Sequence, residues 1–524
     1  MAKAKKVKDE KSIEQTIWDS ANKLRGAVEP SEYKHVVLSL IFLKYANDRF
    51  EQHRQGMIAA GQQAFLEMMP FYVKDNVFFI PECARWAYIM ENAKQPDIAI
   101  KIDTALHEIE TKNASLAGAL PDNYYSRLHL DANCLSSLLD LINGVDLQKE
   151  ADKDVFGRVY EYCLSQFALK EGKGKGEFYS PKTVVALLCE LIQPYSGIVY
   201  DGACGSGGMF VQSMRFVDEH KGNRRNISVY GQEYTDTTRR LAKMNLAIRG
   251  ISANLGLSAA NTFLDDQHKD LKADFALENP PFNQKDWRTE NQLVDDPRWS
   301  GYPTPPTSNA NYGWLLNTLS KLGQDGVGAV LLANGALSSD GAEYEIRKQM
   351  IQNDMVEAII VLPNRMFYTT DISVTCWILN KNKKSRIEKR ETGDVHYRDR
   401  TGEILFMDLR QMGHPYEKKY IEFTQEDRDI VTDKFKSWRQ SDWPQEYCDV
   451  AGFCGSASAS AIVANNYSLI PSLYIAFDSD TEELDFSSEL EHIQAGLTES
   501  FVLEQESRQA LLKIMEDLGY GIDI

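Results

Sequence analysis

Apolar residues recur at three- and four-residue spacings through the first part of the chain. Val36, Leu40 and Leu43, for example, fall on one face of a helix, with polar residues among their neighbours. This period is typical of helices that bury one face. The pattern predicts a helical region from residue 12 to about residue 165.

From Gly176 onward, short apolar runs alternate with helical patterns. The runs are GIVYD, ISVYGQE, ADFALENPP, GVGAVLLANG, MVEAIIVLPN and SVTCWILNK. Strands that alternate with helices are typical of a mostly parallel sheet with helices on both faces. We therefore expect an α/β fold, and the run that ends near Lys381 is the candidate for its final strand.

Two segments lack any period and are expected to be loops. Residues 283–312 are long for a loop in a compact domain, so this segment is either functional or disordered. Residues 454–461, with the sequence CGSASASA, have the small side chains of a linker.

An amphipathic helix is expected near the C-terminus, in a part of the chain that is acidic. From Gln440 to Ser507 there is neither Lys nor Arg. An apolar stripe on such a helix packs either on a partner subunit or on the chain's own body. The stripe consists of Leu490, Ile493, Leu497 and Phe501, and its continuation, or a second helix, is marked by Leu511, Ile514 and Leu518.

The composition is that of a folded protein, with 524 residues of which 43% are hydrophobic and 26% charged. A chain of this length is too long for a single hydrophobic core. We therefore predict three domains, residues 1–165, 166–425 and 426–524. No apolar run is long enough to cross a membrane, and the lysine-rich start lacks the apolar core of a signal peptide. We therefore expect a cytoplasmic protein that does not associate with a membrane.

The net charge and the spacing of the Cys and His residues restrict the kinds of ligand that we expect the chain to bind. The net charge of −18 argues against a chain that grips a polyanion alone, because such affinity comes largely from Lys and Arg. Either the ligand is not a nucleic acid, or another subunit supplies much of the affinity for it. The eight cysteines and nine histidines show no metal-ligand spacing, so we predict no bound metal.

Residues 199–210, VYDGACGSGGMF, combine a strand end, a glycine turn and the start of a helix. Gly205, Gly207 and Gly208 let the backbone approach a ligand where a side chain would collide. The turn lacks both the GxGxxG pattern and the P-loop lysine, and Asp201 at the strand end suits a cofactor with a cationic amino-acid portion. We expect a nucleotide-like cofactor here, with a purely structural turn as the alternative.

Glu233 ends the next strand, about thirty residues after the glycine turn. A carboxylate at this place can accept hydrogen bonds from two ribose hydroxyls. A strand-end glutamate taken alone is more often only solvated. Its position one βα unit after the glycine turn favours the ribose-binding role.

Residues 279–282, Asn-Pro-Pro-Phe, follow the apolar run ADFALE. The exocyclic nitrogen of adenine is a poor nucleophile because its lone pair is delocalised into the ring. The Asn279 side-chain oxygen and the Pro280 carbonyl can accept its two hydrogens, and Pro280 and Pro281 fix φ and hold that carbonyl in place. Phe282 offers a flat face for an extruded base. The motif therefore predicts methyl transfer to a flipped adenine.

These motifs and their order resemble the modification (M) subunit of type I restriction–modification systems, a γ-class amino-methyltransferase. The resemblance spans nearly the whole chain, including residues 176–188, 201–210, 279–282 and 362–379. It implies a Rossmann-like sheet that binds S-adenosylmethionine (SAM), a helical N-terminal domain and a C-terminal helical extension. It also implies methyl transfer from SAM to the N6 amino group of adenine in double-stranded DNA.

The resemblance also assigns cofactor roles by position. Glu233 takes the ribose, and Asn261 stands where relatives often carry an Asp that accepts from the cofactor adenine. The methionine part is contacted by the segment Glu177, Phe178, Tyr179, Ser180, Pro181 and Lys182, and the glycine turn contributes Asp201, Gly202, Gly205, Ser206, Gly207 and Gly208. The family more often has Thr at the position of Ser180. The alternative for Tyr179 and Lys182 is a role outside the cofactor site, as a packing residue or a surface charge.

No basic, loop-rich region that would read a DNA sequence follows the predicted sheet. The resemblance implies that a separate specificity (S) subunit reads the DNA, with a second M subunit and a restriction (R) subunit as further partners. The C-terminal helices are expected to dock on a partner, and the N-terminal helices either pack on their neighbour or clamp DNA. Two alternative functions are a protein-glutamine amide N-methyltransferase, which usually has Tyr after the two prolines, and a non-catalytic SAM-binding scaffold.

Overall fold

The computed structural model of the protein describes residue 18 and residues 30–144, 155–171, 180–367, 370–390, 393–416, 419–477 and 486–517. The chain divides into two compact units, Met1–Ile475 and Ala476–Ile524. The boundaries predicted at residues 165 and 425 both fall inside the first unit and stay predictions.

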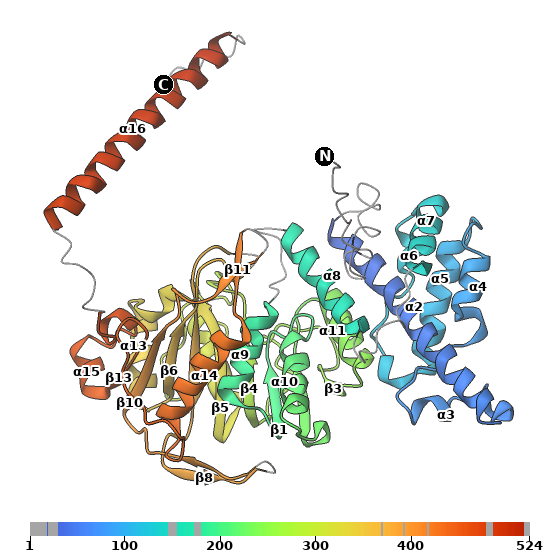
Figure 1. Ribbon diagram of the computed structural model, residues 1–524, viewed down its shortest axis with the longest axis horizontal. Coiled ribbons are helices and arrows are strands. Elements are labelled where there is room, and N and C mark those ends of the chain that lie inside the picture. The colour runs from blue at the N-terminus through green and yellow to red at the C-terminus, as the bar shows by residue number, and fades with distance from the viewer. Residues whose placement is uncertain are drawn as a thin grey trace, which may run out of the picture. The chain divides into compact units, whose positions relative to one another are not determined.

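The predicted helical region is confirmed over the described residues. Its helices share one apolar core, which also includes Leu241 and Met244 of the neighbouring helix α11 (Asp236–Ile248). From α11, Arg240 and Lys243 donate hydrogen bonds of 2.7 and 2.9 Å to carbonyls of this region. The region therefore packs on its neighbour (Figure 1). Its helices are α2 (Pro30–Ala59), α3 (Pro70–Val73), α4 (Trp86–Glu91), α5 (Ile98–Lys112), α6 (Tyr124–Arg127), α7 (Ala132–Asn143) and α8 (Val155–Glu171).

Among the described residues, nine strands form one sheet in the order β13-β10-β6-β7-β5-β4-β1-β2-β3. Neighbouring strands are parallel, except that β7 is antiparallel to β5 and β6, and β13 is antiparallel to β10. The strands are β1 (Gly197–Asp201), β2 (Ile227–Gly231), β3 (Ala253–Asn254), β4 (Ala273–Glu278), β5 (Leu322–Ala333), β6 (Val356–Val361), β7 (Val374–Asn380), β10 (Glu403–Asp408) and β13 (Cys454–Ser458). Four further strands form two separate two-stranded sheets. One consists of β8 (Arg386–Glu388) and β9 (Val395–Tyr397), and the other of β11 (His414–Tyr416) and β12 (Tyr420–Glu422).

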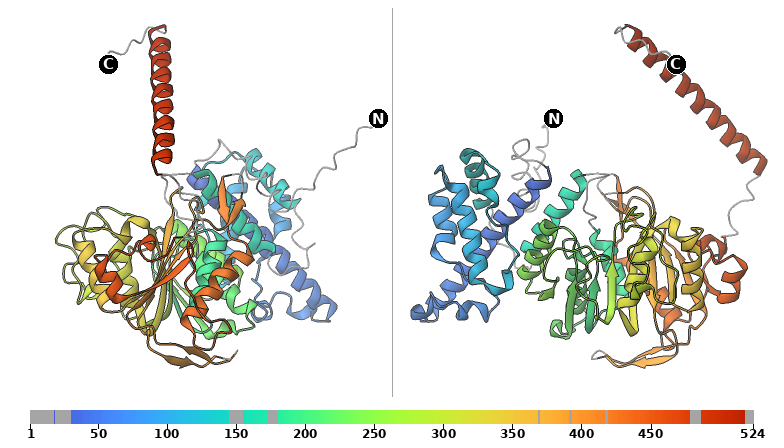
Figure 2. Two further views of the ribbon diagram at one scale, coloured as in Figure 1. Left: turned by 60° about the vertical axis from the view of Figure 1, so that its left-hand side comes forward. Right: turned by 180° about the vertical axis from the view of Figure 1, so that it is seen from behind.

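Each face of the sheet carries its own apolar core, because successive side chains of a strand point to opposite faces. On β6, Ile360 belongs to one core and Ile359 to the other. Helices α9 (Lys182–Ile192), α10 (Gly208–Glu219) and α14 (Gln425–Arg439) cover the first face. Helices α12 (Asn311–Lys321), α13 (Ala342–Gln352) and α15 (Ala459–Ala464) cover the second (Figures 1 and 2). The predicted α/β sheet with helices on both faces is confirmed.

Two predictions about the end of the sheet were wrong. The run that ends near Lys381 forms β7, but β10 and β13 join the sheet after it. The segment 454–461 is not a linker, because it forms β13 and the start of α15. A side chain on Gly455 would come within 2.6 Å of the Tyr474 carbonyl oxygen. Close backbone packing thus accounts for at least this small residue of the segment.

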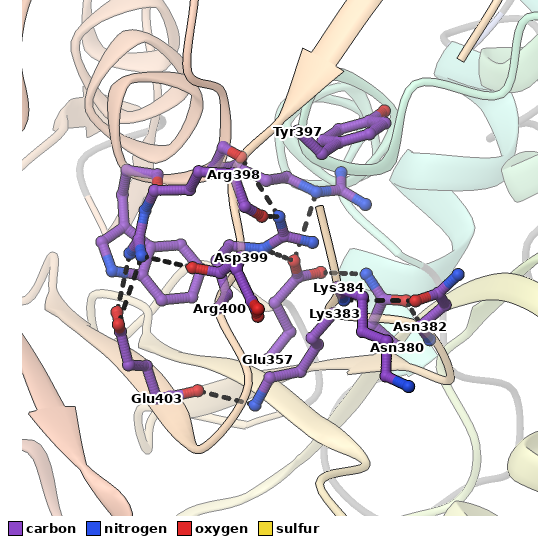
Figure 3. Close-up of polar contacts among 12 residues, drawn as sticks. Glu357, Asn380, Asn382, Lys383, Lys384, Tyr397, Arg398, Asp399, Arg400 and Glu403 are labelled. Carbon is purple, nitrogen blue, oxygen red and sulfur yellow. Dashed lines mark hydrogen bonds and ion pairs between the residues drawn. The ribbon is translucent and has the colours of Figure 1, made fainter. Parts of the chain in front are cut away.

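Buried ion pairs hold the segment after β7 against the sheet. The carboxylate of Glu357 on β6 accepts from Arg400 Nε at 2.9 Å and from Asn380 Nδ2 at 2.8 Å (Figure 3), and Arg439 Nε lies 3.3 Å away. Burial alone would raise the pKa of Glu357, but Arg439 and Arg400 lower the pKa to about 2. This stretch of chain and the sheet are therefore parts of one compact unit.

The second unit contains one long helix, α16 (Phe486–Asp517). The second part of the predicted stripe thus continues the first helix, and Leu518 lies outside the described residues. The side chains of Leu490, Leu497 and Phe501 are exposed. Nowhere in the described ranges does a helix combine the length and the apolarity needed to span a membrane.

Candidate active site

The predicted motifs meet at one edge of the sheet. After β3 the chain returns to the middle of the sheet and places β4 beside β1. In parallel α/β sheets, ligands bind outside the carboxyl ends of the strands at such a change of strand order. Asp201 ends β1, Glu233 lies two residues beyond β2, and Asn279 directly follows β4.

The glycine turn between β1 and α10 depends on glycine at specific positions. Gly205 and Gly207 have φ angles of +52° and +80°, a region that other residues rarely adopt. A side chain on Gly202 would come within 2.8 Å of the Tyr200 hydroxyl. Nothing lies within 4 Å of the position that a side chain on Gly208 would take. The turn thus packs closely on the protein at Gly202 and is open at the first residue of α10.

Two carboxyl groups flank this turn. Asp201 is buried, its Oδ1 accepts from the Ala203 N–H at 3.0 Å, and burial raises its pKa to about 8. Glu233 accepts from the Gly205 N–H at 3.0 Å and from the Thr235 N–H at 2.9 Å, one hydrogen bond to each oxygen. Each carboxylate oxygen has two lone pairs, so each oxygen of Glu233 can accept more than one hydrogen bond.

Asn279 has an unusual set of partners for a buried amide. The residue is only 7% exposed, and its Nδ2 donates to Ser180 Oγ at 2.8 Å. Its Oδ1 is buried and has no hydrogen-bond partner among the described residues. A buried acceptor without a donor costs free energy, so this atom is a place where a ligand N–H would be favoured. Phe282, three residues later, is half-buried and lies edge-on to Phe367.

Asn261 lies in the turn after β3, and its oxygen is already engaged. Oδ1 accepts from the Phe263 N–H at 2.9 Å and from the Leu264 N–H at 3.1 Å. This oxygen therefore has both lone pairs in use, which leaves Nδ2, a donor, for a cofactor base. The predicted acceptor role was carried over from an aspartate, and the asparagine side chain does not offer the same group.

The segment before α9 is described only in part. Glu177, Phe178 and Tyr179 lie outside the described residues. Pro181 is buried at the N-terminal boundary of α9. Lys182 is exposed and lines a hollow between α9, α10 and α14, and no other predicted site residue lines that hollow. This placement favours the alternative of a surface charge for Lys182.

Sequence reasoning missed two residues next to the motifs. Thr262 donates from Oγ1 to the Gly202 carbonyl and so ties the turn after β3 to the glycine turn. Glu278 is fully buried directly before Asn279, and burial raises the pKa of its carboxyl group well above the ordinary range. The available signal for Glu278 was an acidic residue at the end of the strand ADFALE, which also fits a solvated strand end.

Comparisons with known proteins agree with this geometry. The family model described as N-6 DNA Methylase matches residues 151–483, more than half of the chain, and the HsdM N-terminal domain matches residues 13–142. The methylase subunit of the type I restriction enzyme HindI from Haemophilus influenzae is 38% identical, over 84% of this chain and 100% of the relative. The MjaIX methylase subunit from Methanocaldococcus jannaschii is 30% identical, over 97% and 92% of the two chains.

A solved structure supports the fold. The methyltransferase subunit of a type I restriction–modification system from Streptococcus thermophilus superposes with a TM-score of 0.70 at 23% identity, over 88% of this chain and 99% of that one. The resemblance drawn from the motifs is thus confirmed for the family and for the fold. The chain belongs to the N-6 DNA methylase family.

Proposed function

We propose that this chain transfers a methyl group from SAM to the N6 amino group of an adenine in DNA, as the M subunit of a type I restriction–modification complex. The observation that carries the proposal is the buried Oδ1 of Asn279 at the carboxyl end of β4, which has no hydrogen-bond partner in the described part of the chain. Such an atom is a pre-formed acceptor for one hydrogen of the adenine amino group. The family and the named relatives support the reaction class.

The residues of the motif act on the nitrogen of the target base. Oδ1 of Asn279 accepts one N–H and the Pro280 carbonyl accepts the other, which draws the lone pair out of the ring and toward the methyl donor. Both oxygens also stabilise the positive charge that develops on the nitrogen. Phe282 supplies a flat surface for the base once it has left the helical stack, which is how enzymes reach a base in duplex DNA.

The groups around the glycine turn fit SAM. SAM supplies an activated methyl group on a sulfonium centre, and the protein contributes alignment of the reacting groups. Glu233 has acceptor capacity for ribose hydroxyls, and the carboxyl group of Asp201 would be held ionised by a cationic amino group beside it. The open side of the turn at Gly208 leaves room for the backbone to approach the cofactor.

Sequence choice is assigned to a separate S subunit. The net charge of −18 and the lack of Lys and Arg from Gln440 to Ser507 leave little basis for gripping DNA with this chain alone. The exposed apolar residues of α16 form a surface on which a partner helix can pack. The relatives are named as subunits of multi-subunit enzymes, which supports this arrangement.

The test is methyl transfer to unmethylated DNA by the chain co-purified with its specificity subunit. Asn279→Ala should lower kcat by roughly 10²–10³, in line with losing one hydrogen bond made in the transition state. Cofactor binding should be retained. Asn353, an exposed residue at the end of α13, gives a control, and Asn353→Ala should leave kcat unchanged. Near-wild-type turnover by Asn279→Ala would overturn the assignment.

A further inference from the structure

The long segment predicted as a loop after the Asn-Pro-Pro-Phe motif is closed at its base by two asparagines. The Asn283 N–H donates to Asn311 Oδ1 at 3.0 Å, and Asn311 Nδ2 donates to Asn283 Oδ1 at 2.9 Å. Apart from one 3₁₀ turn (Pro297–Trp299), residues 283–310 form no helix or strand, as predicted, whereas the last two residues of the predicted loop begin α12. The paired amides give this loop a fixed start and end.

Aromatic residues anchor the loop on the turn after β3. Trp287 and Trp299 are both buried, and the Trp287 indole N–H donates to the Pro306 carbonyl at 2.8 Å. The Trp287 ring lies 4.4 Å from the ring of Phe263, between their centroids. Because Phe263 follows Asn261 by two residues, the loop packs directly on the segment predicted to contact the cofactor adenine.

Arg298 joins the loop to that segment through charged hydrogen bonds. Its guanidinium group is held by both oxygens of Asp296, each at 2.8 Å. It donates to the carbonyls of Thr262 and Phe263 at 2.8 and 2.6 Å. The guanidinium carbon also lies 5.1 Å from the ring centroid of Trp299. The side chain is only 7% exposed, so these bonds form away from competing water.

The same segment is tied on its other side to the glycine turn. Thr262 donates from its hydroxyl to the Gly202 carbonyl, one residue after Asp201. Residues 261–263 therefore lie between the glycine turn and Arg298. A continuous set of hydrogen bonds runs from the loop after Phe282, through Arg298 and Thr262, to Gly202.

We infer that Arg298 is a positioning residue for the cofactor, acting through the backbone of Thr262 and Phe263. Without the guanidinium group, two carbonyls near the cofactor-binding turn lose charged donors, and the segment that holds Asn261 loses its fixed position. The loop that follows the base-binding motif would then serve the cofactor as well as the target base. This inference rests on the proposed function, because the cofactor in question is SAM.

Arg288 provides a matched control in the same loop. It is buried and donates to the carbonyls of Thr289, Glu290, Gln292 and Pro305. All of these acceptors belong to the loop itself. Replacing Arg288 should therefore loosen the loop without acting directly on residues 261–263.

The experiment compares Arg298→Lys with Arg288→Lys in the purified full-length chain. Lysine keeps the charge but cannot reproduce the planar fork of donors. The dissociation constant of S-adenosylhomocysteine, measured by calorimetry, should rise about tenfold in Arg298→Lys, the effect of losing one charged hydrogen bond. The dissociation constant should change by less than about twofold in Arg288→Lys. The melting temperatures show how far each variant is destabilised.

A second variant and a kinetic measurement distinguish a loss of cofactor positioning from a general loss of stability. Asp296→Asn keeps Arg298 but removes its charged anchor, so it should weaken cofactor binding in the same direction and by less. In the complex with the specificity subunit, Arg298→Lys should raise KM for SAM and change kcat by less than about threefold. Unchanged cofactor affinity in Arg298→Lys, or equal weakening in Arg288→Lys, would overturn this inference alone. No cofactor binding by the unmodified chain would overturn the proposed function as well.

Discussion

At Asn279, the two ends of one amide group have different partners. Nδ2 donates to Ser180, whereas the buried Oδ1 has no donor among the residues that the structure describes. The contact with Ser180 engages the nitrogen end of the amide, which leaves Oδ1 as the end that can face a substrate. Because Oδ1 accepts and Nδ2 donates, only this orientation suits an amino group as the ligand.

The substitution Ser180→Ala should remove the hydrogen bond that holds the side-chain amide of Asn279. The loss of one neutral hydrogen bond corresponds to about 1 kcal/mol, so kcat at saturating SAM should fall about fivefold, because Oδ1 no longer has a fixed orientation. Ser180→Thr keeps the hydroxyl and should retain nearly full activity. Steady-state kinetics on unmethylated DNA check both variants. An unchanged kcat in Ser180→Ala would show that the amide is oriented by other contacts.

We expect Asp201 to make cofactor binding depend on pH. Burial raises its pKa from an ordinary value of 3.8 to about 8, so the folded state holds this proton more tightly than the unfolded chain. Its contribution to stability is therefore fully present below about pH 4 and is lost as the pH rises through about 8. A cationic ligand favours the ionised carboxylate and offsets that loss.

We therefore expect the rise in melting temperature caused by S-adenosylhomocysteine to grow between about pH 6.5 and pH 8.5. In Asp201→Asn this growth should disappear, since the side chain can no longer ionise. Thermal unfolding with and without the ligand across this range is the measurement. A ligand effect that shrinks with pH in the unmodified chain would contradict the role given to Asp201.

The positions of candidate site residues were predictable where the backbone context is regular. Asn279 was placed correctly after a strand, because the apolar run before it predicts that strand. The hydrogen bonds of Asn261 could not be predicted in the same way, because its oxygen is engaged by its own turn. Arg298 was not singled out because the carbonyls that it joins to the loop, those of Thr262 and Phe263, lie more than thirty residues away in the chain.

At the scale of elements, the strands from β1 to β7 were predictable, apart from the two-residue β3, because their apolar runs are long. β10 and β13 were missed for different reasons. β10 follows a stretch rich in charged residues whose pairing with buried partners, such as Arg400 with Glu357, appears only in three dimensions. β13 has the composition of a linker, and its position is set by the approach of another backbone segment at Gly455.

Gly455→Ala should therefore destabilise the edge of the sheet. The added methyl group would lie 2.6 Å from the Tyr474 carbonyl oxygen, and relieving such a contact costs about 1–3 kcal/mol of the free energy of unfolding. Gly56→Ala in helix α2, where nothing lies within 4 Å of the new methyl group, is the control and should be neutral or slightly stabilising. Urea unfolding compares the two, and equal stability would show that the backbone adjusts without cost.

At the scale of the whole molecule, the chain separates the chemistry from the choice of sequence. The candidate active site lies in the first compact unit, whereas α16 belongs to the second and exposes apolar side chains. The sequence predicted both features but could not decide between a partner subunit and the chain's own body as the surface for α16. The periodicity of a helix shows that one face is apolar and does not show what covers it.

Substitutions on α16 can decide this question. Leu497→Glu combined with Phe501→Glu should prevent co-purification with the specificity subunit, because the charges disrupt an apolar contact. The melting temperature and cofactor affinity of the lone chain should be unchanged. Ala495→Glu combined with Gln509→Glu adds the same charge at exposed positions away from the apolar stripe and should leave complex formation intact. If α16 instead covers the chain's own body, the first pair would lower the melting temperature of the isolated chain and leave its co-purification with the specificity subunit largely unaffected.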